Sequence, residues 1–149
     1  MPDPDPAGDP DEVARRSTEL MWSGDAASRM LGMSVASVGP GSASVEMTVR
    51  DDMVNGWGMC HGGLVASLAD SAFAVACNSH GVVTVAAGFD VTFLDAAQLG
   101  DRLVAAAVER ATRGRSGVYD VTVTRAGDGT VVAEFRGRSR STGRPIAGS

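Results

Sequence analysis

The sequence has no lysine and few aromatic residues, with one tyrosine and two tryptophans among 149 residues. So few side chains for base stacking, together with a net charge of −5, argue against a nucleic-acid partner. No apolar run approaches the roughly 20 residues of a membrane-spanning helix, so we expect no membrane partner. Residues 1–10 are acidic and Pro-rich and lack the basic start of a signal peptide, which predicts a disordered tail on a cytoplasmic protein.

Cysteine and histidine are also scarce, with two of each. Cys60 and His61 stand at the start of a predicted helix, whereas Cys77 and His80 stand at its end. At a rise of about 1.5 Å per residue, the two pairs lie about 25 Å apart. This separation excludes a four-ligand zinc site within one chain and a disulfide between the two cysteines. We therefore expect neither a metal nor another cofactor.

The basic residues are all arginine, and they gather in the C-terminal third of the chain. Residues 102–149 hold nine arginines against four acidic residues, whereas residues 3–12 hold five acidic residues and none that is basic. The arginine excess fits either a solvated surface or a docking patch for a phosphate-bearing ligand, because the guanidinium group matches the geometry of phosphate.

The length suits one domain with a substantial core, which we expect over residues 11–149. A first helix is predicted over residues 11–31, with a break at Gly24, and a longer one over residues 61–79. The remaining apolar runs are joined by short turns, which predicts antiparallel strands. The expected fold class is α+β, with one long helix on the apolar face of a long antiparallel sheet. Strands are predicted at 33–38, 42–50, 82–94, 101–113, 117–126 and 130–140.

The strand predicted at 82–94 shows the clearest alternation. Every odd position from Val83 to Phe93 is apolar, while the even positions include Thr84, Asp90 and Thr92. Alternation with a period of two predicts a strand with one buried face.

The helix predicted at 61–79 has two different faces and one internal acid. Asp70 is its only charged residue between Leu64 and Cys77. An uncompensated buried carboxylate is costly, so Asp70 is either a hydrogen-bonded structural residue or a general base or nucleophile in a water-poor cleft. The face expected to pack on the sheet holds Val65, Leu68, Ala69, Ala72 and Ala76. The face around Asp70 consists of small residues, namely Gly63, Ala66, Ser67, Ala74 and Cys77.

Small residues on a helix let another backbone approach closely, and the simplest partner is the same helix of a second subunit. The Gly62-Gly63 pair at the helix start leaves backbone N–H groups open to a ligand, at the positive end of the helix dipole. Gly62 and Asp70 lie about 12 Å apart along one helix, so they cannot contact the same carbonyl within one chain. Two antiparallel helices would bring Asp70 of one subunit to the Gly62 end of the other.

The segment from Asn55 to Gly81, NGWGMCHGGLVASLADSAFAVACNSHG, resembles the signature of hotdog-fold acyl-CoA thioesterases of the phenylacetic acid degradation (PaaI) type. That signature has Asn-Gly, then His-Gly-Gly six residues after the Asn, then an Asp nine residues after the His. Five residues fit these spacings, and the likeness continues through VTFL, SGVYDV and FRGRS to cover most of residues 20–140. The matching residues are Asn55, His61, Gly62, Gly63 and Asp70.

The resemblance implies a hotdog fold, in which a long antiparallel sheet wraps around one central helix. It implies hydrolysis of an acyl-CoA thioester, with an aromatic acyl group such as phenylacetyl or hydroxyphenylacetyl. Asp70 would be the catalytic carboxylate, the Gly62 amide would polarise the thioester carbonyl, and Asn55 and His61 would shape the site from the partner subunit. Because family members are tetramers of two dimers, we expect a homotetramer with shared sites.

Further substrate contacts follow from this hypothesis. Gly63 and Ser67 would contact the substrate beside Asp70, and the CoA phosphates would lie near Arg113, Arg115 or Arg138. The chain departs from the family where Asp95 and Ala96 follow the FL of the long strand, since the family often has Arg-Pro there. That exchange bears on CoA binding or acyl preference.

Two other functions stay open on the same fold. An enoyl-CoA hydratase or dehydratase would need an acid–base pair of His and Asp, and the only nearby histidine stands in the HGG turn. A non-catalytic acyl-CoA-binding protein would bind the same ligand without turnover.

Overall fold

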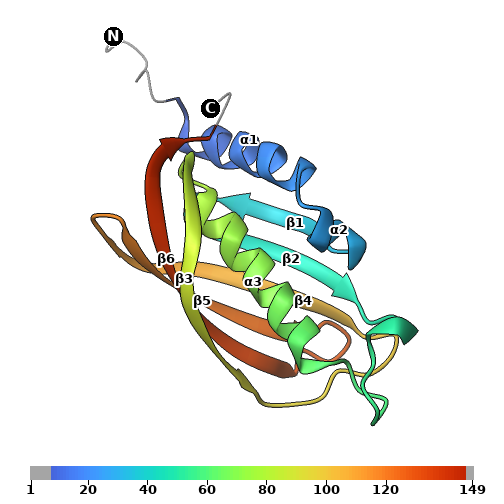
Figure 1. Cartoon of the computed structure of the whole chain (residues 1–149). Helices are drawn as coiled ribbons and strands as arrows, with labels where there is room; N and C mark the ends of the chain where they lie inside the picture. The colour runs from blue at the N-terminus through green and yellow to red at the C-terminus, as the bar shows by residue number, and fades with distance from the viewer. Residues whose placement is uncertain (1–7, 147–149) are drawn as a thin grey trace.

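The computed structural model describes residues 8–146, in which a curved six-stranded antiparallel sheet surrounds one long helix (Figure 1). The helices and strands are α1 (Pro10–Ser23), α2 (Ala26–Met30), β1 (Ser34–Gly39), β2 (Ser42–Thr48), a 3-10 helix (Asp51–Met53), α3 (Gly62–Asn78), β3 (Val82–Phe93), β4 (Arg102–Arg113), β5 (Ser116–Arg125) and β6 (Val131–Pro145). The strands lie in the order β1-β2-β4-β5-β6-β3, and α3 contacts all six of them. The predicted α+β class and hotdog architecture are confirmed.

Helix α3 packs on the sheet through the face that the sequence predicts. An Ala-rich segment without proline favours the helix, and the His61 side chain caps its start. The helix comes close to β6 because position 137 is glycine, where a Cβ atom would lie 2.8 Å from the Phe73 ring. The predicted sheet-facing residues are all at most 2% exposed: Val65, Leu68, Ala69, Ala72 and Ala76.

The predicted helix over residues 11–31 is broken at Gly24, as expected, into α1 and α2. Gly24 ends α1, and the Asp25 carboxylate caps the start of α2. Helix α1 contacts β1 and α3, so the N-terminal segment lies on the helix side of the fold (Figure 1). Of the predicted disordered tail, residues 1–7 lie outside the described residues, whereas Pro10 is already the first residue of α1.

Strand β3 differs from its prediction in one respect. It is the edge strand next to β6, and none of its residues is fully buried within the chain. Val85, Phe89 and Phe93 are 51%, 42% and 49% exposed. The prediction of a buried face is therefore wrong for the single chain, because alternation reports an apolar face but not what covers it. The structure leaves an apolar strand at one end of the sheet, with one edge paired to β6 and the other edge free of a partner strand in this chain.

The ends of the remaining elements lie close to their predicted positions. Strand β6 reaches Pro145, five residues beyond the predicted end at 140, because its last part pairs with the start of β3. Among residues 8–146, no helix is long and apolar enough to span a membrane.

Candidate active site

The loop before α3 is organised by the side chain of Asn55. Its Oδ1 atom accepts hydrogen bonds from the backbone N–H groups of Trp57 at 2.9 Å and Met59 at 3.2 Å. Asparagine suits this position because a short side-chain carbonyl can close a turn two residues on. Its Nδ2 group has no partner among the described residues, so the Asn55 side chain has a free donor. Trp57, in the same loop, is 86% exposed.

The first turn of α3 leaves one backbone donor open. The N–H groups of Leu64 and Val65 both bond to the His61 carbonyl, and the Gly63 N–H donates to His61 Nδ1 at 3.3 Å. The Gly62 N–H has no acceptor within residues 8–146. Because His61 Nδ1 accepts a bond, its proton lies on Nε2, which makes a second donor at this exposed side chain. The helix start thus offers donors to an oxygen that develops negative charge.

A hollow of about 400 Å³ lies beside this helix start. Asn55, Gly62, Phe93 and Asp95 are among the residues that line it. A Cβ atom at position 62 would lie 3.1 Å from the Phe93 ring, so glycine lets β3 and the helix start approach each other. Asp95, which stands where the family often has arginine, is not an isolated charge, because its Oδ2 lies 3.4 Å from Arg125.

Asp70 lies on the opposite side of α3 from the sheet, half-buried in a separate hollow of about 210 Å³. Its carboxylate has no hydrogen-bond or ion-pair partner within the described part of the chain. Burial, followed by the negative charge of Asp25, raises the pKa of Asp70 above its usual value. A carboxylate without a partner and with a raised pKa is suited to accept a proton, as predicted for the functional alternative.

The other predicted members of the site lie on the same helix. The Ser67 hydroxyl donates to the Gly63 carbonyl at 2.8 Å, and Ser67 lines the hollow of Asp70. Gly63 uses its own N–H in the helix cap, so any contact with a ligand is by close approach alone. The hollows of Gly62 and Asp70 share no lining residue. One chain therefore keeps the two key groups apart, at the separation of about 12 Å that the helix rise dictates.

The three arginines expected at the CoA phosphates differ in their surroundings. Arg138 Nη1 is 2.9 Å from Asp90, so its charge is already paired. Arg113 and Arg115 have no carboxylate partner among residues 8–146, and both flank the turn between β4 and β5. Two free guanidinium groups at one turn leave this end of the sheet locally basic.

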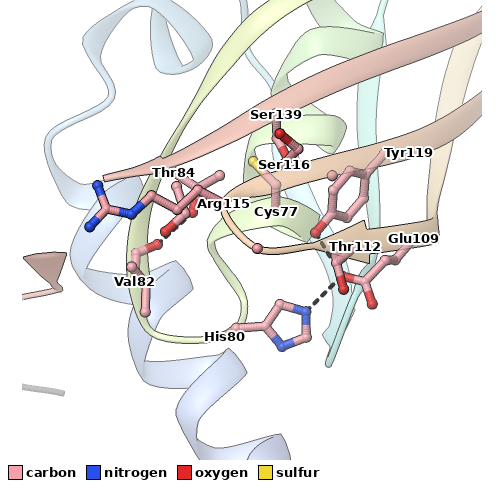
Figure 2. Close-up of a pocket in the computed structure, with 13 residues that line it drawn as sticks. Cys77, His80, Val82, Thr84, Glu109, Thr112, Arg115, Ser116, Tyr119 and Ser139 are labelled. Atoms are coloured by element: carbon pink, nitrogen blue, oxygen red, sulfur yellow. Dashed lines mark hydrogen bonds and ion pairs between the residues drawn. The ribbon is translucent and has the colours of Figure 1, made fainter. Parts of the chain in front are cut away.

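Arg115 also borders a third hollow, of about 280 Å³, at the C-terminal end of α3 (Figure 2). Figure 2 shows Tyr119 and His80 both pointing toward Glu109, whose Oε1 accepts from Tyr119 at 2.7 Å and lies 2.8 Å from His80 Nε2. Burial alone would raise the pKa of Glu109, but the hydrogen bonds from Tyr119 and His80 outweigh it and lower that pKa. No pattern in the sequence indicates this cluster, because His80 follows α3 whereas Glu109 and Tyr119 lie on β4 and β5.

Comparisons with known proteins show to which family the chain belongs. The family model of the thioesterase superfamily matches residues 58–132. Escherichia coli (strain K12) acyl-coenzyme A thioesterase PaaI is 42% identical over 135 residues, which cover 91% of this chain and 96% of that protein. The chain belongs to the thioesterase superfamily. The resemblance to hotdog-fold thioesterases of the PaaI type is thereby confirmed.

Two solved structures are also similar to this chain. The E. coli PaaI protein from the phenylacetic acid degradation operon has a TM-score of 0.90 at 39% identity, and the match covers 93% of this chain and 100% of that one. A Streptococcus mutans UA159 protein bound to acetyl CoA has a TM-score of 0.73 at 26% identity, over 76% and 91% of the two chains.

Sequence reasoning missed two neighbours of the superfamily signature residues. Phe93 lies against Gly62, although the sequence marked it only as a core residue of its strand. Asp25 lies in the hollow of Asp70, although its sequence context indicates only a helix boundary. The sequence indicates at most that Asp25 caps a helix, and a helix cap does not predict a contact with a hollow formed 45 positions later in the chain.

Proposed function

We propose that this protein is an acyl-CoA thioesterase, which hydrolyses an acyl-CoA to the free acid and CoA. The observation that carries the proposal is the unpaired Asp70 carboxylate on the same helix as the free Gly62 N–H. These are the base or nucleophile and the oxyanion donor that thioester hydrolysis requires. The E. coli relative, at 42% identity, is named as an acyl-coenzyme A thioesterase, and the S. mutans protein is bound to acetyl CoA.

Each active site is formed by two subunits. Strand β3 presents an apolar, unpaired edge, and pairing with a second copy along this edge would cover Val85, Phe89 and Phe93. The two α3 helices are then antiparallel, with Asp70 facing Gly62 of the partner subunit. This arrangement supplies what one chain lacks, namely a backbone donor and the Asp70 carboxylate on either side of one thioester carbonyl. The association of two such dimers into a tetramer rests on the resemblance alone.

Two routes of hydrolysis fit these groups. In the first, Asp70 takes a proton from water as the water oxygen bonds to the carbonyl carbon, and the oxyanion accepts from the partner's Gly62 N–H. The C–S bond then breaks, and Asp70 returns the proton to the sulfur of CoA. In the second, an Asp70 oxygen attacks the carbonyl carbon and displaces the CoA thiolate, which gives a mixed anhydride that water cleaves.

Asn55 and His61 provide further donors at the carbonyl oxygen, through Nδ2 and Nε2. The acyl group is aromatic, such as phenylacetyl or hydroxyphenylacetyl, and the support for this is the E. coli PaaI protein of the phenylacetic acid degradation operon. The CoA phosphates bind near Arg113 and Arg115, which have no carboxylate partners within residues 8–146. Arg138 joins them only if its exposed pair with Asp90 opens, which costs about 1 kcal/mol or less.

The test is release of free thiol from a panel of acyl-CoA thioesters, with phenylacetyl-CoA and its hydroxylated forms beside acetyl-CoA. The proposal predicts thiol release that the Asp70→Asn variant lacks. If both proteins bind acyl-CoA and neither releases thiol, the protein is a non-catalytic binder and the proposal fails. Loss of enoyl-CoA absorbance without thiol release would instead identify a hydratase.

A single-turnover experiment in oxygen-18 water separates the two routes. Label in the Asp70 carboxylate identifies direct attack by Asp70. Label only in the released acid, with no acyl-enzyme trapped by hydroxylamine in the same turnover, identifies water activated by Asp70 as a general base.

A further inference from the structure

A second carboxylate, that of Asp25, lines the same hollow as Asp70. The chain reaches it from a different element, since Asp25 precedes α2 whereas Asp70 lies in the middle of α3. The other residues that line the hollow are uncharged: Ala27, Ser28, Leu31, Met33, Ser67, Ser71 and Ala74. Two carboxylates thus share one small space that holds no cation from the described residues.

Two hydrogen bonds from Ser28 hold the Asp25 carboxylate, and a third joins Ser28 to Ser71 on α3. Its Oδ1 accepts from the Ser28 N–H at 3.0 Å, and its Oδ2 accepts from the Ser28 hydroxyl at 2.7 Å. The Ser28 oxygen also lies 2.8 Å from the hydroxyl oxygen of Ser71. Because Ser28 has one proton and gives it to Asp25, Ser71 must be the donor to Ser28. A chain of bonds from Ser71 through Ser28 to Asp25 therefore fastens α2 to the residue that follows Asp70.

No arginine among the described residues pairs with the Asp25 carboxylate, whose hydrogen-bond partner is Ser28. Arg29, on α2, donates to the Asp25 backbone carbonyl at 3.3 Å and not to its carboxylate. The only titratable residue of α3 other than Asp70 is Cys77. Burial is the main cause that raises the pKa of its thiol to about 12, so Cys77 is neutral at pH 7. From the opposite subunit of the proposed dimer, the partner's His61 and the partner's Asn55 face Asp70. The negative charge of Asp25 adds to the effect of burial, and both raise the pKa of Asp70.

We propose that Asp25 is a positioning residue for thioester hydrolysis, held by Ser28 and Ser71 so that its negative charge keeps the Asp70 carboxylate a strong base. This inference rests on the proposed function. Its physical consequence has two sides. A carboxylate that binds a proton more tightly is the better base or nucleophile at neutral pH, but it is also protonated, and so inactive, at a higher pH than an ordinary aspartate.

The test is the pH profile of kcat/KM for wild type and Asp25→Asn. Asparagine caps a helix about as well as aspartate, so this variant removes the charge and keeps the cap. The acid limb should move down by about half a pH unit to one pH unit, as expected for one charge within about 10 Å. The rate on the plateau should fall about threefold, because the Asp70 carboxylate becomes a weaker base. Glu19→Gln, which removes an exposed charge from α1, is the matched control and should leave the profile unmoved.

A second readout does not depend on turnover. Carbon-13 NMR titration of the aspartate carboxyl groups reports the pKa of Asp70, whose signal is identified by its loss in Asp70→Asn. That pKa should fall in Asp25→Asn even if the protein hydrolyses none of the thioesters tested, so failure of this inference is distinguishable from failure of the proposed function. Asp25→Ser, another uncharged cap, replaces Asp25→Asn if the latter does not fold. An Asp70 pKa that is unchanged in a folded Asp25 variant would overturn the inference.

Discussion

The two sides of α3 contact different surroundings. On the sheet side, Leu68 and Ala72 are fully buried among strands. On the other side, Ser67, Asp70 and Ala74 are half-buried and line a hollow, with a carboxylate that has no partner in the described chain. The sheet side of α3 therefore contributes apolar burial that stabilises the fold, whereas the other side keeps a charge that burial disfavours.

The largest effect is expected for Asp70→Asn, which changes the side of α3 that faces away from the sheet. We expect kcat/KM for the best thioester to fall about 1,000-fold, because the base or nucleophile is lost while the shape of the side chain is kept. The melting temperature should not fall, because no partner of Asp70 in the described chain loses a bond. Steady-state thiol release and a thermal melt check the two statements. Wild-type activity in a folded variant would remove Asp70 from the mechanism.

A second substitution truncates a side chain on the sheet side of α3. Leu68→Ala should lower the free energy of unfolding by about 3 kcal/mol, because the fully buried side chain leaves a cavity. Leu64→Ala is the matched control and should cost less, since Leu64 is only half-buried. Urea denaturation of both variants gives the two values. Equal losses would mean that the depth of burial on this side of α3 does not set the cost of truncation.

A third change tests the backbone donor at the helix start. Gly62 is the first residue of α3, a position that tolerates proline, and the backbone of His61 (φ −59°, ψ 130°) suits a residue before proline. Gly62→Pro removes the N–H, whereas Gly62→Ala keeps it and adds similar bulk against Phe93. We expect kcat to be about 100-fold lower in the proline variant than in the alanine variant. Equal kcat values in the two would exclude this amide as the oxyanion donor.

The smallest expected effect is the pH dependence of stability. Because the pKa of Asp70 is raised in the folded state, that state binds the proton more tightly than the unfolded chain does. Stability is therefore lost as pH rises through the folded pKa, and Asp70→Asn does not share this loss. Thermal melts should show a slightly higher melting temperature for the variant than for wild type at pH 7. This difference in melting temperature should shrink toward pH 4. A gap that widens on acidification would contradict the raised pKa.

The sequence predicts local features well where one segment suffices. The sheet-facing side of α3 and the break at Gly24 depend on neighbours within a few residues, and the structure agrees with both. The signature residues around Asp70 also carry the family assignment, because their spacing reflects one helix and the turn before it.

Features that join distant segments could not be predicted. The alternation in β3 indicates an apolar face, but its position at the edge of the sheet depends on the order of all six strands. Asp25 and Asp70 line the same hollow because the hydrogen bond between Ser28 and Ser71 holds α2 against α3. Glu109 meets His80 and Tyr119 across the end of the helix. No local pattern encodes such contacts.

If each site takes Asp70 from one subunit and Gly62 from the other, two inactive variants can restore a site when they are mixed. Asp70→Asn and Gly62→Pro are combined in equal amounts, dissociated and reassociated. A shared site predicts recovery of about a quarter of wild-type thiol release, because half of the dimers are mixed and each of those has one intact site. If each site lies within one subunit, the mixture contains no intact site, and activity that stays at the level of the separate variants would contradict the account.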